Sequence, residues 1–126
     1  MKKYVIWLDS EIAKIFALNV SGIEKSSLKK GGMDHHLHNK KDNPGDSHLD
    51  HFFRDLAAKI HLADELLILG PGRAKSDFRN YLEVHEHTKL FKKIVGFENS
   101  DHPTDNQIFA TARQFFKTYD LFNEPT

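Results

Sequence analysis

The sequence predicts an α/β protein: a three-layer α/β/α sandwich around a mixed sheet, with elements in the order β-β-β-α-β-α-β-α. The N-terminal part contains three short β-rich runs separated by turns, which is typical of an antiparallel meander. In the rest of the chain, short apolar runs alternate with stretches whose apolar residues recur at helical spacing. Strands that alternate with helices indicate an α/β layer, so the two parts together predict a mixed sheet.

The predicted meander opens the chain. Residues 4–8 are apolar and β-rich, and residues 9–11 (Asp-Ser-Glu) form a polar turn. Residues 12–20 alternate between two faces, which predicts the second strand of a hairpin. Residues 21–22 (Ser-Gly) are a second turn, and residues 23–30 form a third, more polar strand.

A loop and a helix follow. Residues 31–47 have no apolar period and many loop-forming residues, so we expect a mobile loop there. Apolar residues at helical spacing between residues 49 and 60 predict an amphipathic helix with Asp46 or Ser47 as its N-cap.

The centre of the chain is a strand, a tight turn and a helix. Residues 66–69 (Leu-Leu-Ile-Leu) are apolar without interruption, which indicates a strand buried on both faces. The next three residues, Gly-Pro-Gly, break the strand, because glycine can take positive φ and proline fixes its own φ. A helix is predicted to follow, with one face formed by Phe78, Tyr81, Leu82 and His85.

The last predicted strand covers residues 93–98, and the last helix follows a capping sequence. Thr104 and Gln107 have the spacing of a capping box, and Asp105 places negative charge in the first turn, where the helix dipole favours it. Residues 120–126 are expected to fray. We therefore expect one domain over residues 1–126.

Composition restricts the class of protein. Hydrophobic residues make up 39% of the 126 residues, which suits a folded domain, and the 18 basic and 18 acidic residues cancel. This balance does not favour a DNA-binding protein, although residues 1–44 hold eight Lys against five acidic residues. The absence of cysteine excludes disulfides, thiolate catalysis and Cys-based zinc sites. The N-terminal apolar run is too short for a signal peptide or a membrane span, so we expect a cytoplasmic protein with no membrane partner. From the balanced charge we also expect no DNA partner.

The Gly-Pro-Gly turn is the first candidate binding site. In one interpretation, free N–H groups at the helix start bind a phosphate of RNA or a nucleotide. In the other, the turn is only a compact connection between strand and helix. The residues of the candidate phosphate site are Gly70, Gly72, Arg73 and Lys75.

The histidines form a second candidate site. Their imidazoles could bind zinc or nickel, but their spacing matches no defined zinc motif, which favours solvated side chains over a metal site. In a third interpretation, His38, Lys40 and Lys41 contact RNA phosphates. The candidate metal ligands are His35, His36, His38, His48 and His51.

The segment Asp101-His102-Pro103-Thr104-Asp105 contains groups that acid–base chemistry could use. Thr104 and Asp105 also serve as cap and first-turn acid of a helix, and adjacent side chains point in different directions. The segment therefore has a structural and a catalytic interpretation.

Three segments resemble a known family: Ile6-Trp7-Leu8-Asp9 with residues 11–16, residues 67–72 with Ala74-Lys75, and residues 101–105 with Gln107. They are similar to the C-terminal domain (domain 3) of archaeal and eukaryotic class I peptide-chain release factors and of Pelota, and to bacterial stand-alone proteins of that type. The resemblance implies a fold related to the kink-turn-binding ribosomal proteins. It also implies association with translation, through ribosomal RNA or a translation factor such as a GTPase.

The same resemblance does not imply catalysis. Release factors of this family use a Gly-Gly-Gln motif in another domain, whereas this chain has Gly31-Gly32-Met33. We therefore predict a non-catalytic, cofactor-free module that docks on RNA, the ribosome or a translation factor. The alternative is a small hydrolase or metal-dependent protein that uses His102 with Asp101, or the loop histidines at 35, 36 and 38.

Overall fold

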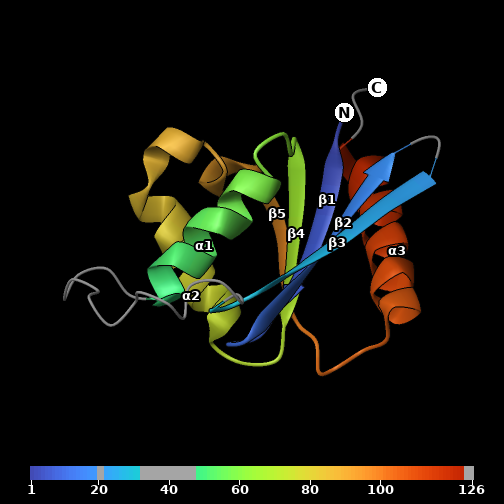
Figure 1. The fold of residues 1–126 in the computed structure, drawn as a ribbon. Helices are drawn as coiled ribbons and strands as arrows, with labels where there is room; N and C mark the ends of the chain where they lie inside the picture. The colour runs from blue at the N-terminus through green and yellow to red at the C-terminus, as the bar shows by residue number, and fades with distance from the viewer. Residues whose placement is uncertain (20–21, 32–47, 124–126) are drawn as a thin grey trace.

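The structure is a computed structural model that describes residues 1–19, 22–31 and 48–123. A five-stranded sheet has the strand order β3-β2-β1-β4-β5, and helices cover both of its faces (Figure 1). The predicted α/β fold, its mixed sheet and its element order are confirmed. The elements are β1 (Lys3–Leu8), β2 (Ile12–Asn19), β3 (Gly22–Lys29), α1 (His48–Lys59), β4 (Glu65–Gly70), α2 (Ala74–Val84), the 3-10 turns η3 (Glu86–Thr88) and η4 (Phe91–Lys93), β5 (Ile94–Asn99) and α3 (Asp105–Asn123).

Strand pairing explains why the sheet is mixed. β1 pairs antiparallel with β2, and β2 pairs antiparallel with β3, as tight turns require. On its other side β1 pairs parallel with β4, and β4 pairs parallel with β5. The two parallel pairs follow from helical connections, because a chain must cross over the sheet before it can return in the same direction.

The core consists of two layers, one on each face of the sheet. Figure 1 shows α1 and α2 on one face and α3 on the other. In β4, Leu66 and Ile68 join the layer under α1 and α2, whereas Leu67 and Leu69 join the layer under α3. All four are almost fully buried, which confirms the prediction that this strand is covered on both faces.

Helix α2 is fixed by the face that it buries, and the start of helix α3 is fixed by a cap. Phe78 and Leu82 of α2 are fully buried, and each contributes about 1.5–3 kcal/mol of hydrophobic stabilisation. At the start of α3, the Gln107 N–H donates to Thr104 Oγ1 (3.1 Å) and the Thr104 N–H donates to Gln107 Oε1 (2.8 Å). The predicted capping box is therefore confirmed.

Some predicted boundaries differ from the structure or lie outside it. Helix α3 continues to Asn123, so residues 120–123 extend the helix where the sequence predicted a frayed tail. The predicted mobile loop lies outside the described residues apart from residue 31, as do the two N-cap candidates of α1, Asp46 and Ser47. β3 is mostly exposed, which explains its polar sequence: it forms one edge of the sheet.

Candidate functional site

Three parallel strands end at the same edge of the sheet, and the residues that follow them meet there. We call this the carboxyl edge and define it as Asp9 after β1, residues 70–73 at the end of β4 and beyond it, and residues 100–102 after β5. The Ser100 N–H donates to the Gly70 carbonyl (2.8 Å), which joins the second and third of these segments. In open α/β sheets, ligands bind preferentially at such an edge.

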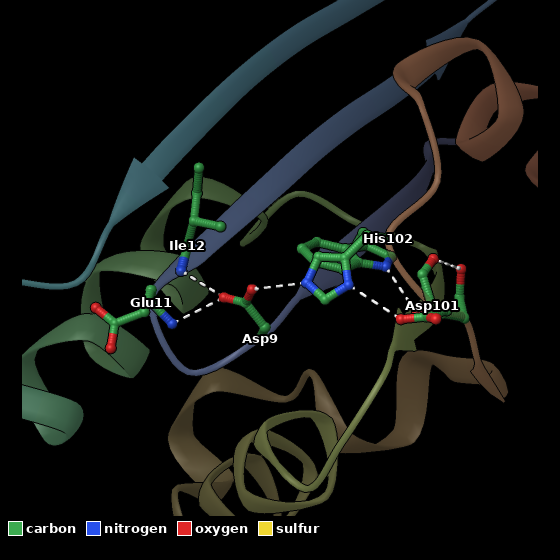
Figure 2. Close-up of polar contacts among 7 residues, drawn as sticks. Asp9, Glu11, Ile12, Asp101 and His102 are labelled. Carbon is green, nitrogen blue, oxygen red and sulfur yellow. Dashed lines mark hydrogen bonds and ion pairs between the residues drawn. The ribbon is translucent and has the colours of Figure 1, made fainter.

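Asp9 shapes the turn between β1 and β2. Its Oδ1 accepts hydrogen bonds from the N–H groups of Glu11 (2.8 Å) and Ile12 (2.9 Å), as Figure 2 shows. This is the pattern of an Asx turn, in which a short acidic side chain replaces a backbone acceptor. The turn uses Oδ1, which leaves the second carboxylate oxygen of Asp9, Oδ2, directed toward His102 (Figure 2).

His102 lies between two carboxylates (Figure 2). Its Nδ1 is 3.0 Å from Asp101 Oδ1, and its Nε2 is 3.6 Å from Asp9 Oδ2. The imidazole side chain is 69% exposed, so water screens both contacts. The hydrogen bond from His102 is the main cause that lowers the pKa of Asp101 below its ordinary value.

Trp7 holds the segment that carries His102. The Trp7 Nε1–H donates to the Ser100 carbonyl (3.0 Å), and the Trp7 and His102 ring centroids are 5.2 Å apart. Trp7 is buried, and its indole N–H has a partner, as a buried indole requires. Sequence positions 7 and 100 are thereby fixed to each other at the carboxyl edge.

The two glycines of the Gly-Pro-Gly turn have different roles. Neither takes positive φ, so the conformational reason given from sequence for these glycines is wrong. Gly70 is needed for close approach, because a Cβ there would overlap the carbonyl oxygen of Leu8 on the neighbouring strand. A Cβ at Gly72 would meet nothing within 4 Å.

The two cations of the turn, Lys75 and Arg73, differ in their exposure and contacts. Lys75 is only 5% exposed, and its Nζ donates to the Gly72 carbonyl (2.8 Å) and lies 5.5 Å from the Phe97 ring centroid. Its ammonium is therefore held inside the turn, which differs from the exposed phosphate contact that the sequence suggested. Arg73 is 88% exposed, and its one ion pair within the described residues is a long i,i+4 contact with Asp77 (3.9 Å). The guanidinium of Arg73 is therefore an exposed cation at the carboxyl edge.

Asp105 has a further role that sequence reasoning missed. Its carboxylate is 2.8 Å from Lys25 Nζ and 3.1 Å from Lys14 Nζ, which joins the start of α3 to β3 and β2. The hydrogen bonds from Lys25 and then Lys14 lower the pKa of Asp105. The pairing could not be read from spacing, because Lys25 and Asp105 are 80 positions apart.

The histidine prediction is only partly addressed by the structure. His35, His36, His38, Lys40 and Lys41 lie outside the described residues, and of His48 the structure describes only the backbone at the start of α1. His51 lies in α1. In residues 1–19, 22–31 and 48–123, no group of three or more His, Cys, Asp or Glu is placed to hold a metal ion. The same part of the chain contains no helix long and apolar enough to cross a membrane.

Asp101 and His102 were predicted as possible acid–base groups, whereas Asp9 was predicted only as a turn residue. The structure brings all three together. The one signal that could have found Asp9 is its position directly after a strand, because side chains that follow parallel strands share an edge. That signal becomes usable only when β1 is known to pair parallel with β4.

The fold of this chain matches part of several solved structures. Pelota from Archaeoglobus fulgidus matches with a TM-score of 0.63 and 17% identity over 90% of this chain and 31% of its own. The archaeal translation termination factor aRF1 matches with a TM-score of 0.54 and 15% identity over 95% of this chain and 40% of its own. S. cerevisiae Dom34, described as a translation termination-like factor that is involved in RNA quality control pathways and interacts with Hbs1, matches with a TM-score of 0.51 and 11% identity over 97% of this chain and 38% of its own.

These matches establish the fold that the sequence resemblance implied. The chain spans between about a third and two fifths of the length of the proteins it matches. By sequence, no family model and no curated protein matches it.

Proposed function

We propose that this chain is a translation-associated binding module that docks on the ribosome, its RNA or a translation factor and carries out no bond-making or bond-breaking step. The observation that carries the proposal is the fold. Nearly the whole chain superposes on part of Pelota, of the archaeal translation termination factor aRF1 and of the translation termination-like factor Dom34. A cytoplasmic location follows from that role.

The proposed docking surface is the carboxyl edge. Arg73 is its exposed cation, at the start of α2, where unpaired backbone N–H groups also favour an anionic partner. Among the residues that the structure describes, no side chain caps that helix start. These features suit a phosphate of RNA or an acidic side chain of a translation factor.

The contacts of His102 support a docking role rather than hydrolysis. A general base needs a ring nitrogen directed at a nucleophile or at its water. In the described residues, both nitrogens of His102 face carboxylates, those of Asp101 and Asp9. These contacts connect the β1–β2 turn to the segment before α3, which supports a role for His102 in shaping the edge.

The test is co-sedimentation with purified ribosomes at low and high salt. We expect wild-type protein to pellet at low salt and to dissociate as salt rises, because neutralised phosphates release counterions when they bind. Arg73→Gln should weaken pelleting. Lys59→Gln, which removes an equal charge from the exposed end of α1, should not. Wild-type protein that stays in the supernatant at every salt concentration contradicts the proposal, and equal pelleting of both variants removes the carboxyl edge from it.

A further inference from the structure

A second surface, away from the carboxyl edge, is built from the start of β1 and the outer side of α3. It is a hollow of about 520 Å³ lined by Lys3, Ala110, Arg113, Gln114, Phe116, Lys117 and Asp120. Phe116 is buried in the core layer under α3 and forms an apolar floor. Three cations and one carboxylate surround it, in a chain whose net charge is zero.

The cations of this hollow are not neutralised equally. Lys3 Nζ lies 3.3 Å from Asp120 Oδ2 and 3.8 Å from Glu65 Oε1, so its charge is compensated. Within the described residues, Arg113 and Lys117 form no ion pair with a carboxylate. They are an i,i+4 pair of like charge on exposed turns of α3, an arrangement that costs about 0.2–0.5 kcal/mol in an isolated helix.

Arg113 also has the geometry of a nucleic-acid contact. Its guanidinium lies 5.4 Å from the Phe109 ring centroid, so a cation and a half-buried aromatic ring form one continuous surface. A base can stack on such a surface while its phosphates contact the cations. Lys117 lies one helical turn further along, about 6 Å by the rise of the helix. Two cations at that separation can each contact a different phosphate of one extended strand.

We propose that the Arg113–Lys117 hollow binds the phosphate backbone of a single-stranded RNA segment. The inference deepens the proposed function and rests on it: RNA at this hollow is a second contact with the translation apparatus, independent of Arg73. Asp120 opposes the binding, because its carboxylate lies in the same hollow as the phosphates. Removal of that carboxylate therefore has the opposite effect to removal of the cations.

The test is fluorescence anisotropy with a labelled single-stranded RNA of about 12 nucleotides, between about 0.05 and 0.3 M salt. Arg113→Gln/Lys117→Gln removes two phosphate contacts. The slope of log K against log salt should become shallower by about 1.4, and affinity at about 0.1 M salt should fall about 25-fold. Asp120→Asn should bind more tightly than wild type. Lys59→Gln/Lys92→Gln, an exposed pair on α1 and η4 with the same loss of charge, is the matched control.

Three results overturn the proposal: equal slopes for the Arg113/Lys117 variant and the control, equal affinity for those two variants, or weaker binding by Asp120→Asn. Circular dichroism confirms that each variant is folded. Ribosome co-sedimentation separates this inference from the proposed function. If wild type and the Arg113/Lys117 variant pellet equally, the hollow is not an RNA contact but the docking role stands. If wild type does not pellet, the docking role itself fails.

Discussion

The Gly-Pro-Gly turn gives a stability prediction with an internal control. Gly70→Ala places a Cβ against the carbonyl oxygen of Leu8, and a backbone atom in a sheet cannot move aside as the end of a flexible side chain can. The strain has to be relieved by separating β1 from β4 near the Trp7–Leu69 pair. Overpacking of this kind costs about 1–3 kcal/mol.

Gly72→Ala is the matched substitution in the same turn. Its Cβ meets nothing within 4 Å and its φ is not positive, so no strain is expected. Both variants share the gain of about 0.4–1 kcal/mol that comes from a less flexible unfolded chain. The difference between them therefore isolates the contact with Leu8.

The assay is urea and thermal unfolding, followed by the fluorescence of Trp7, the only tryptophan of the chain, which is buried beside this edge. We expect Gly70→Ala to unfold about 3–15 °C below Gly72→Ala, at about 3–5 °C per kcal/mol for a domain of this size. Gly72→Ala should match or slightly exceed wild type. Equal stability of the two variants would refute the close-approach explanation of Gly70.

Two further predictions concern side chains that join distant segments. Trp7→Phe keeps an aromatic ring but removes the donor to the Ser100 carbonyl, so the free energy of unfolding should fall by about 1–3 kcal/mol in urea titrations followed by circular dichroism; an unchanged midpoint contradicts this role. Asp105→Asn should make the free energy of unfolding depend less on pH in the acidic range. The folded-state pKa of Asp105 lies below its ordinary value of 3.8, so its contribution is present above that pH and is lost as pH falls through the folded pKa. Urea midpoints at about pH 3 and pH 6 should therefore differ less in Asp105→Asn than in wild type, and an equal difference contradicts the pairing with Lys14 and Lys25.

Much of the fold follows from local patterns. The uninterrupted apolar run of β4 requires burial on both faces, and the Thr104–Gln107 spacing defines the start of α3. Each of these features depends on residues that lie only a few positions apart in the sequence. The sequence resemblance also pointed to the fold that the structural matches establish.

The site was harder to predict, because its contacts are between distant segments. Asp9 meets His102 only because β1 and β5 flank β4 in one parallel arrangement, which no local period encodes. Gly70 was explained by the wrong property: the structure needs its small size, not its conformational freedom. Lys75 looked like a surface cation, since lysine is rarely buried, yet the Gly72 carbonyl and the Phe97 ring hold it inside the turn.

The most direct test of the docking role is site-specific photo-crosslinking to purified ribosomes. A photoreactive amino acid replaces Arg73 at the carboxyl edge in one variant, Arg113 in the hollow in a second, and Lys59 on α1 in a third. We predict crosslinks to ribosomal RNA or to a translation protein from position 73 or 113, and none above background from position 59. The absence of crosslinks from both 73 and 113, or equal crosslinking from all three, would contradict a translation-associated module that docks through these surfaces.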